Sequence, residues 1–197
     1  MNIPNIITVA RIFAVPLVVW LIINGQLLIA FWVFVAAGIS DGVDGYVAKR
    51  FKQQTLLGSY LDPLADKALL VSIYVALGFQ LHLPSWLVIM VVSRDILIVS
   101  AVILSWMMDR AVAMQPLYIS KANTVGQITL AALVLAGAGY TIEMDGVRSA
   151  MVVIVAVLTI LSAVAYLIEW LDHMAAGEAD KMKLIRPPSS HAETNQE

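Results

Sequence analysis

Residues 40–67 read SDGVDGYVAKRFKQQTLLGSYLDPLADK and carry four aspartates at fixed spacing, Asp41, Asp44, Asp62 and Asp66. Long apolar runs flank this stretch on both sides, and apolar residues make up 60% of the chain. Ionisable side chains at the edge of a membrane are costly, and they usually mark an ion, substrate or proton site. The stretch therefore raises the question of what four carboxylates bind together at a bilayer surface.

The composition is typical of a protein with several membrane-spanning helices. Only 13% of the 197 residues are charged, whereas a soluble domain carries roughly a quarter. The formal net charge of −2 gives no sign of a nucleic-acid partner, and the lack of cysteine excludes disulfides, thiolate metal sites and cysteine nucleophiles. Residues 1–5 lack a basic segment and no small-residue cleavage site follows, so we expect neither a signal peptide nor a transit peptide.

Six apolar segments approach the roughly 20 residues that a helix needs to cross a bilayer. They are predicted at residues 6–23, 27–47, 64–80, 86–107, 125–140 and 151–171. Turn-like breaks separate them at residues 24–26, 82–84 and 143–146, and residues 49–55 form a short basic connection. We therefore predict an all-α, polytopic integral membrane protein with six transmembrane helices.

The distribution of lysine and arginine predicts the orientation, because these residues accumulate in cytoplasmic loops. With the loops numbered alternately, one side receives Lys49, Arg50, Lys52, Arg110, Lys121, Lys181, Lys183 and Arg186, and the other receives Arg148. Both termini and the aspartates should therefore face the cytoplasm, in a bacterial inner membrane. Residues 1–175 form the predicted membrane domain, and residues 176–197 a polar, disordered cytoplasmic tail.

The first pair of aspartates lies on one face of a predicted helix. At about 100° per residue, Asp41 and Asp44 share a sector roughly 100° wide with two small residues, Gly45 and Ala48. The small residues leave room for something large to approach the backbone. The alternatives are a helix contact made by small residues and a solvated Asp44.

The second pair is predicted at the start of a helix. Gly58 lets the chain turn, Asp62 takes the N-cap position, and Pro63 follows at the first helical position. Asp66 lies one turn further on the same face. Taken alone, Asp62 is more often a helix cap than a ligand. Because the second span ends where the third begins, we expect the two pairs to converge.

Four carboxylates at contact distance repel one another strongly where screening is weak. Divalent cations would neutralise them, and hard oxygen ligands select Mg²⁺, Mn²⁺ or Ca²⁺. Two such ions can clamp a diphosphate and stabilise charge on the phosphorus under attack. A carboxylate not fully committed to metal can accept the proton of an attacking hydroxyl. The residues thus predict metal-dependent phosphoryl transfer.

The spacing resembles the signature of the CDP-alcohol phosphatidyltransferases, D-x2-D-G-x2-A-R-x8-G-x3-D-x3-D. The chain matches it at Asp41, Asp44, Gly45, Ala48, Gly58, Asp62 and Asp66. Lys49 stands at the arginine position, where it keeps the charge but loses the bidentate fork, so a phosphate contact weakens or passes to Arg50. The resemblance implies two divalent cations, Mg²⁺ or Mn²⁺, held by the four aspartates, with Asp66 as the general base.

The resemblance also implies binding residues for both substrates. Those for the nucleotide of the CDP-lipid are Asn5, Thr8, Asp41, Gly45, Ala48, Lys49 and Gly58. The opening segment resembles the P-N-x-L-T-x-x-R start of the family, although an interfacial N-terminus with a snorkelling Arg11 is an equal alternative. Arg94 and Lys121 are implied to bind an acceptor phosphate. The alternative for Arg94 is a neutralised structural pair with Asp95.

Within the family, the chain is most similar to cardiolipin synthases of the CDP-alcohol type, on residues 61–67, 93–95 and 118–124. This implies transfer from CDP-diacylglycerol to phosphatidylglycerol in the lipid bilayer, by a homodimer. The alternative acceptor is glycerol 3-phosphate, as in phosphatidylglycerophosphate synthases. Two remoter alternatives are a cation carrier or channel, for which no acidic path continues across the membrane, and an aromatic prenyltransferase, which has more spans.

Overall fold

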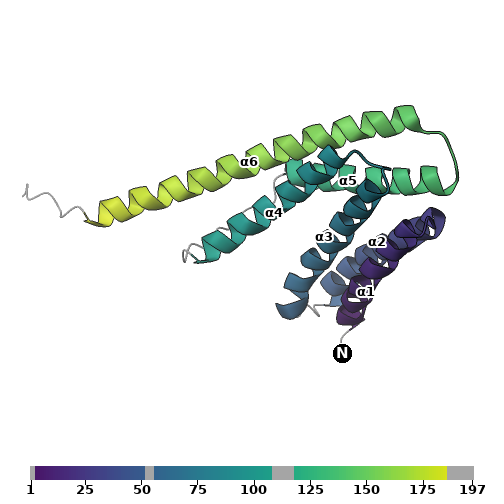
Figure 1. Ribbon diagram of the computed structural model, residues 1–197. Helices are drawn as coiled ribbons and strands as arrows, with labels where there is room; N and C mark the ends of the chain where they lie inside the picture. Colours follow the sequence, from purple (N-terminus) through teal and green to yellow (C-terminus); the bar gives the residue numbers. More distant parts are fainter. Residues whose placement is uncertain (1–2, 52–55, 108–117, 186–197) are drawn as a thin grey trace, which may run out of the picture.

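The described part of the chain forms six α-helices, seen in a computed structural model (Figure 1). The structure describes the backbone of residues 3–51, 56–107 and 118–185, and the side chains of residues 11–40, 67–100 and 118–171. The helices are α1 (Ile3–Ile23), α2 (Leu27–Phe51), α3 (Leu56–Phe79), α4 (Ser85–Met107), α5 (Tyr118–Gly139) and α6 (Asp145–Ile185). Every regular element in this backbone is an α-helix, which confirms the all-α prediction.

The last helix is longer than the sequence analysis predicted. α6 continues to Ile185, so residues 176–185 of the expected disordered tail are helical. Residues 172–185 contain several alanines, lysines and methionines, which favour helix, and the first proline after them is Pro187. Residues 186–197 of the predicted tail lie outside the described residues.

Two described stretches are long and apolar enough to cross a membrane, Tyr118–Gly139 and Asp145–Leu171. Shorter apolar helical stretches are Arg11–Ile23, Leu27–Ser40 and Lys67–Phe79. These five stretches fall within five of the six predicted segments or overlap them. Six complete membrane spans, and the orientation of the chain, stay predictions.

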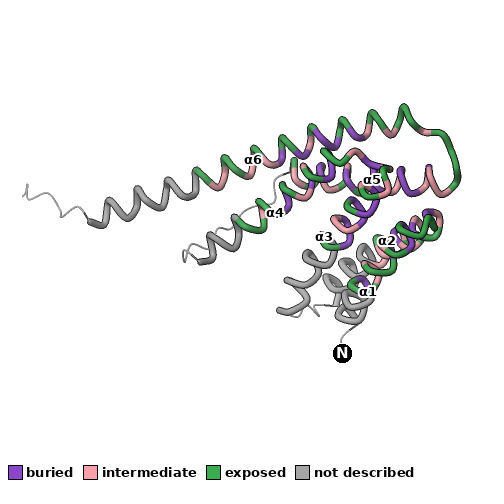
Figure 2. Tube along the Cα trace, in the orientation of Figure 1, coloured by how far each residue is buried: buried purple, intermediate pink, exposed green. Residues whose placement is uncertain are grey.

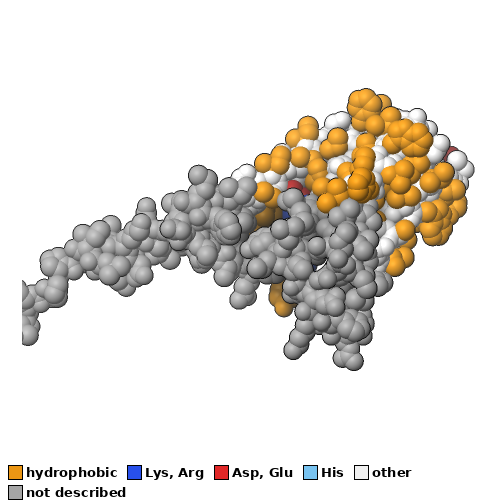
Figure 3. All heavy atoms as spheres, turned by 90° about the horizontal axis from the view of Figure 1, so that it is seen from below, with side chains coloured by type: hydrophobic (Ala, Val, Ile, Leu, Met, Phe, Trp, Pro, Cys, Tyr) orange, Lys and Arg blue, Asp and Glu red, His pale blue; other side chains and the backbone are white. Residues whose placement is uncertain are grey.

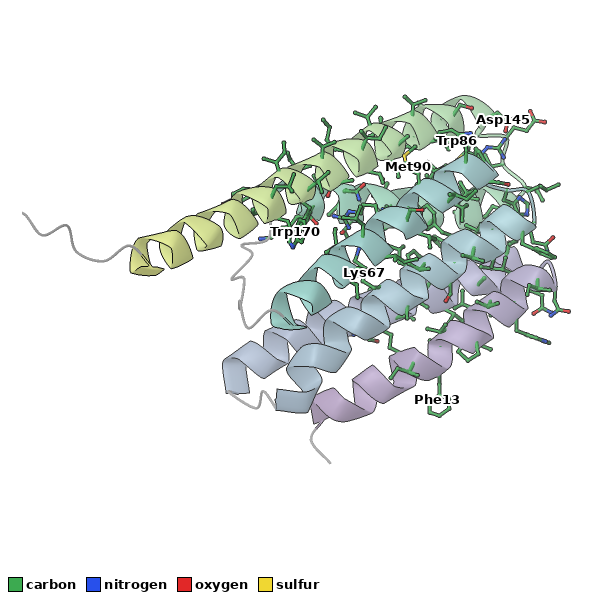
Figure 4. All side chains as sticks on the ribbon, turned by 60° about the vertical axis from the view of Figure 1, so that its left-hand side comes forward. Phe13, Lys67, Trp86, Met90, Asp145 and Trp170 are labelled. Carbon is green, nitrogen blue, oxygen red and sulfur yellow. The ribbon has the colours of Figure 1, made fainter. Side chains whose placement is uncertain are left out.

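The outward faces of the helices are apolar. Large hydrophobic side chains such as Phe13, Trp20, Phe79 and Ile89 are at least half exposed. Phe13 points away from the bundle in Figure 4, and exposed positions recur along the described helices in Figure 2. Hydrophobic side chains spread over the described face in Figure 3, with few charged atoms among them. Contiguous apolar surface of this kind marks a membrane or protein contact, as the predicted membrane location requires.

Three connections share one backbone design. Each contains a residue in the left-handed region, with φ of 72° at Gly25, 60° at Leu81 and 54° at Thr141. In the first, the amide of Gln26 donates to the carbonyl of Leu21 at 2.8 Å, across the end of α1. Equivalent bonds run from residue 82 to residue 77 at 2.9 Å, and from residue 142 to residue 137 at 2.9 Å. These are Schellman-type caps, which satisfy the last carbonyls of α1, α3 and α5.

The three connections, residues 24–26, 80–84 and 140–144, lie together at what we call the loop end. Gln80 Nε2 donates to the carbonyl oxygen of Ile23 at 2.8 Å and so links the first two connections. His82 lines a cavity together with residues 141–145, which links the third. Figure 4 shows Trp86 and Asp145 at this end. The helices therefore alternate in direction, so that α2 ends and α3 begins away from the loop end.

Packing inside the bundle is close between helices distant in sequence. α1 contacts α2 and α3, while α5 contacts α2, α3 and α6, and α4 contacts α3 and α6. The fully buried side chains include Ile22, Ile73, Leu77 and Leu130. A Cβ on Gly139 would lie 2.8 Å from the backbone of Leu28, so α2 and α5 approach there at a distance that only glycine permits. This contact fixes the start of α2 beside the end of α5.

Candidate functional site

The four predicted metal ligands lie on two consecutive helices. Asp41 and Asp44 belong to α2, and Asp62 and Asp66 belong to α3. The two helices are joined by residues 52–55 only, which keeps the end of one near the start of the other in the chain. The side chains of all four lie outside the described residues, so their convergence stays a prediction. Among the side chains that are described, none forms a metal-binding group of three or more His, Cys, Asp or Glu.

The predicted start of α3 was wrong. The helix begins at Leu56, so Gly58 is not a turn and Asp62 is not an N-cap. The apolar residues of LLGSYL continue the helical stretch, and they outweigh the local signals of Gly58 and Pro63. Asp62 lies within the helix, where its backbone position gives it no capping role. The correction removes the most common alternative to ligation for this residue.

The residues implied to bind the nucleotide lie on the three N-terminal helices, α1, α2 and α3. Asn5 and Thr8 belong to α1, a group on α2 consists of Asp41, Gly45, Ala48 and Lys49, and Gly58 belongs to α3. Their side chains also fall outside the described residues. Their roles stay predictions.

The first described side chain of α3 belongs to an ion network. Lys67, the residue after Asp66, has its Nζ 2.9 Å from Asp95 Oδ1 and 3.1 Å from Asp95 Oδ2. Asp95 Oδ1 also accepts a hydrogen bond of 2.7 Å from Arg94 Nη1. A single carboxylate from α4 is thus shared between a cation of α3 and a cation of its own helix. Lys67 thus connects α3 to α4 at the position that follows Asp66 in the chain.

Arg94 extends the network to the last two helices. Its Nη2 donates to Ser120 Oγ of α5 at 2.7 Å and to Ser162 Oγ of α6 at 2.5 Å. The guanidinium carbon lies 5.6 Å from the centre of the Tyr166 ring, a cation–π distance. The residue is 4% exposed, and its Nε is buried with no hydrogen-bond partner among the described residues. We call Lys67, Asp95, Arg94, Ser120 and Ser162 the ion network.

The charges of the ion network do not cancel. It holds two cations and one carboxylate, and Arg94 and Asp95 are both buried. Buried charge is costly unless it is paired, and the two buried groups, Arg94 and Asp95, pair with each other. Among the described side chains the remaining cation is Lys67, which keeps 37% of its side chain exposed. The sequence analysis weighed a simple pair of Arg94 and Asp95 against acceptor binding, and it missed Lys67. No local signal indicates that contact, because it depends on how α3 and α4 pack.

The second predicted acceptor residue has a different environment. Lys121 is exposed on α5, and its Nζ lies 5.7 Å from the centre of the Tyr118 ring. Arg94 is buried, so the structure gives the two predicted acceptor residues unlike surroundings. The neighbour of Lys121, Ser120, is the α5 residue that contacts Arg94.

Buried polar side chains continue from the ion network along α5 and α6. Asn123 Oδ1 accepts a hydrogen bond of 3.0 Å from Thr159 Oγ1, and both residues are fully buried. One turn further, Gln127 is fully buried, and its backbone carbonyl accepts a hydrogen bond of 3.0 Å from the Tyr74 hydroxyl. Ser120, Asn123 and Gln127 recur every three or four residues, so they share one helix face. The sequence analysis did not single out the last two.

A cleft of about 470 Å³ opens beside the ion network. Its polar end contains Lys67, Arg94, Asp95 and Ser120. Its remaining wall is mostly apolar and comes from α3, α4 and α6, with Ala68, Val71, Val92, Ile96, Ile98, Val99, Ser100 and Tyr166. Figure 4 shows Lys67 on α3 within the bundle, well away from Asp145 and Trp86 at the loop end. The cleft is therefore separate from the cavities of the loop end.

Comparison with known proteins gives a consistent result. A family model described as CDP-alcohol phosphatidyltransferase matches residues 1–171. The chain is 33% identical over 188 residues to the chloroplastic CDP-diacylglycerol–glycerol-3-phosphate 3-phosphatidyltransferase 1 of Oryza sativa subsp. japonica, covering 86% of this chain and 57% of that one. It is 36% identical over 151 residues to the cardiolipin synthase (CMP-forming) of Homo sapiens, covering 68% of this chain and 50% of that one.

The match to a bacterial relative extends over most of that relative's length. The CDP-diacylglycerol–glycerol-3-phosphate 3-phosphatidyltransferase of Escherichia coli (strain K12) is 31% identical over 175 residues, 84% of this chain and 93% of that protein. The chain therefore spans about half the length of the rice and human relatives and nearly all of the E. coli one. The names of these relatives give two different activities, glycerol-3-phosphate 3-phosphatidyltransferase and cardiolipin synthase.

Proposed function

The chain belongs to the CDP-alcohol phosphatidyltransferase family, and from this premise we propose that it makes cardiolipin and CMP from CDP-diacylglycerol and phosphatidylglycerol. The observation that carries the reaction class is the run of signature residues from Asp41 to Asp66, within the stretch matched by the family model. The choice of phosphatidylglycerol rests on the likeness to cardiolipin synthases at residues 61–67, 93–95 and 118–124.

In the proposed reaction the acceptor hydroxyl attacks the phosphorus that carries diacylglycerol. A new bond forms between that oxygen and the phosphorus, and the bond from the phosphorus to the CMP oxygen breaks. Asp66 accepts the hydroxyl proton, and CMP leaves with the electron pair of the broken bond. Lys49 offsets negative charge on the nucleotide phosphates. Lys67, the neighbour of Asp66 in the chain, donates two hydrogen bonds to Asp95 of α4.

The donor set suits two divalent cations, Mg²⁺ or Mn²⁺. Asp41 and Asp44 are three residues apart on α2, and Asp62 and Asp66 are four apart on α3, so each pair shares a helix face. Carboxylate oxygens are the ligands that these hard cations prefer. When bound, the cations would offset charge on the diphosphate and on the departing CMP. The correction of Asp62 from helix cap to helix interior supports its place in this set.

The proposal includes the surroundings of the enzyme. We propose that six helices cross a bacterial inner membrane, with the aspartates and both termini on the cytoplasmic side, and that the enzyme is a homodimer. The exposed apolar faces of the described helices support contact with lipid. Arg148 is the one lysine or arginine in the loop-end connections and their flanks. This scarcity of basic residues supports placing the loop end on the side of the membrane away from the cytoplasm.

Phosphatidylglycerophosphate synthesis from glycerol 3-phosphate is the second candidate. It is favoured by the E. coli relative, which aligns over 93% of its length. An acceptor panel separates the two: purified protein is incubated with CDP-diacylglycerol, Mn²⁺ and one acceptor at a time, and lipid products and CMP are measured. We expect cardiolipin with phosphatidylglycerol. Product from glycerol 3-phosphate and none from phosphatidylglycerol would overturn the choice.

One control accompanies the panel. Omission of the divalent cation, with chelator, should stop CMP release with every acceptor. A cation carrier would release no CMP from the CDP-lipid under any of these conditions, so metal-dependent release distinguishes a transferase from a carrier.

A further inference from the structure

We propose that two adjoining cavities at the loop end bind the headgroup of a membrane phospholipid that carries a primary amine beyond its phosphodiester. The inference rests on the membrane location proposed above and goes beyond the reaction, because this lipid is neither the donor nor the acceptor. It is carried by the aromatic residues of the loop end, by the positions of its charges and by the residues that line the two cavities.

The loop end carries the aromatic side chains that are typical of a membrane interface. Trp20 precedes the first connection by four residues, Trp86 follows the second by two, and Tyr140 begins the third. These three side chains are 56%, 50% and 47% exposed. Figure 4 shows Trp86 and Asp145 at this same end of the bundle. Because tryptophan and tyrosine gather where hydrocarbon meets the polar headgroups, the pattern favours headgroup depth for the loop end.

The first cavity has a volume of about 480 Å³ and suits a phosphate. Its polar lining is Arg148, His82, Ser85 and Ser149, without a carboxylate, and its apolar lining is Leu81, Leu83, Pro84, Val152 and Val153. Arg148 Nη2 lies 2.8 Å from Asp145 Oδ1, and this side chain has no other polar partner among the described residues. The guanidinium therefore keeps N–H groups that can donate to phosphate oxygens, and the two hydroxyls can add to them.

The second cavity, of about 290 Å³, contains the acidic side chains of this end. Glu143 and Asp145 line it, and it shares His82 and Arg148 with the first cavity. Glu143 is exposed and has no ion-pair partner in the described part of the chain. An ammonium group can donate to such a carboxylate.

The charge count at the loop end favours a group with charges of both signs. Residues 18–30, 76–90 and 136–152 all have described side chains, and their lysine, arginine, aspartate and glutamate residues are Glu143, Asp145 and Arg148. Two negative charges against one positive charge do not suit an anion alone. A headgroup in which a short linker joins a phosphodiester to a primary amine would place its phosphate beside Arg148 and its ammonium beside Glu143.

The apolar part of the first cavity suits the rest of the same lipid. Val153 of α6 lines this cavity and is 59% exposed, whereas its neighbour Val152 lines it and is buried. An acyl chain that continues from the headgroup would cover Val153 and remove its side chain from water. A soluble phosphate ester with the same headgroup would leave this wall bare.

The test measures lipid binding directly. Purified full-length protein, stripped of lipid in mild detergent, is titrated with phosphatidylethanolamine or with phosphatidylcholine of the same acyl chains, and dissociation constants are read by native mass spectrometry. Phosphatidylcholine keeps the phosphate but has methyl groups in place of the N–H donors. Phosphatidylglycerol is left out because it is the proposed acceptor. CMP release with the acceptor panel is measured on the same preparations.

We expect the wild type to bind phosphatidylethanolamine about ten-fold more tightly than phosphatidylcholine, the effect of one charge-assisted hydrogen bond at a partly exposed site. Glu143→Gln should abolish this preference, and Arg148→Gln should weaken the binding of both lipids about ten-fold. Val153→Trp should fill the apolar wall and weaken both. The matched control is Ile154→Trp, at a residue that is 49% exposed and lines neither cavity, and it should match the wild type. CMP release should be unchanged in all four variants.

Three results would overturn the inference. Equal affinity of the wild type for the two lipids would show that the amine is not recognised. Wild-type affinity in Arg148→Gln would show that the phosphate is not held there. Equal weakening by Val153→Trp and Ile154→Trp would show that lipid binds along α6 without a site. A wild type that releases no CMP with any acceptor would refute the proposed function instead, and the titrations would still decide whether the lipid site exists.

Discussion

The loop end and the ion network hold the helices together by different means. At the loop end, backbone amides cap α1, α3 and α5, and the ion pair between Arg148 and Asp145, 2.8 Å long, is exposed. In the ion network, the buried charges of Arg94 and Asp95 on α4 are joined to the partly exposed Lys67 of α3 and to hydroxyls of α5 and α6. Backbone caps add stability at little cost, whereas buried charges are costly and are usually retained for specificity or function. The difference is consistent with the proposal that places the chemistry away from the loop end.

The largest effect is expected for substitution of Asp66, which precedes Lys67 of the ion network in the chain. Asp66→Asn should lower turnover by about 10²- to 10⁴-fold, because the amide cannot accept the acceptor's proton, while binding of the CDP-lipid remains. CMP release and CDP-lipid binding are measured on the same preparation. In contrast, Asp41→Asn and Asp62→Asn should lower the affinity for the divalent cation, so that a higher cation concentration is needed for half-maximal rate. Normal turnover in Asp66→Asn would remove this residue from the base role.

The next prediction compares the two regions directly through one substitution in each. Asp95→Asn removes the only negative charge of the ion network and leaves Arg94 and Lys67 without it, so the free energy of unfolding should fall by about 3 kcal/mol or more. Asp145→Asn breaks the exposed pair with Arg148 and should cost no more than about 1 kcal/mol. Both are measured by denaturation in mixed micelles.

Equal losses in the two variants would contradict the comparison. It would then follow that burial adds nothing to the importance of the Asp95 charge. The acceptor KM is a second readout: Asp95→Asn should shift it, since the site loses the group that orients both cations, and Asp145→Asn should not.

The smallest effect is expected at the loop end. Leu81 has a φ of 60° and is 86% exposed, so its side chain contributes little packing while its backbone bears the left-handed strain. Leu81→Gly should raise the free energy of unfolding by about 1 kcal/mol and leave turnover unchanged. Gly25→Ala is the converse control: its φ of 72° makes the substitution destabilising, although its neighbourhood is open. A loss of turnover in Leu81→Gly would connect the loop end to catalysis.

The sequence predicted the features that depend on short-range patterns. The six helices and the predicted breaks at residues 24–26 and 82–84 follow from apolar run length and turn residues. It also named the four aspartates by spacing, and Arg94 by residue type. It misplaced the start of α3, because Gly58 and Asp62-Pro63 resemble a helix start when read locally, and the apolar residues around them decide otherwise.

The contacts that the sequence could not supply depend on packing between helices. The bond between Lys67 and Asp95 joins residues 28 apart, and the bond between Arg94 and Ser162 joins residues 68 apart. Neither follows from a period of 3.6, because each requires the rotation and depth of two helices at once. Likewise, the sequence gives no indication that Asn123 and Gln127 are fully buried, because their burial depends on how α5 packs in the bundle.

Under the proposed topology of six membrane spans, the charges in the middle of α4 would also constrain how the protein is inserted into the membrane. A segment with Arg94 and Asp95 near its centre partitions poorly into lipid when it is released alone from the insertion machinery, at a cost of about 3 kcal/mol for each charge. Lys67 of α3 is synthesised before α4 and is its ion partner, so the two should leave the translocon as a hairpin. Ser120 and Ser162 are synthesised later, so under this topology the hydrogen bonds from Arg94 to both hydroxyls would form only after α5 and α6 are in place.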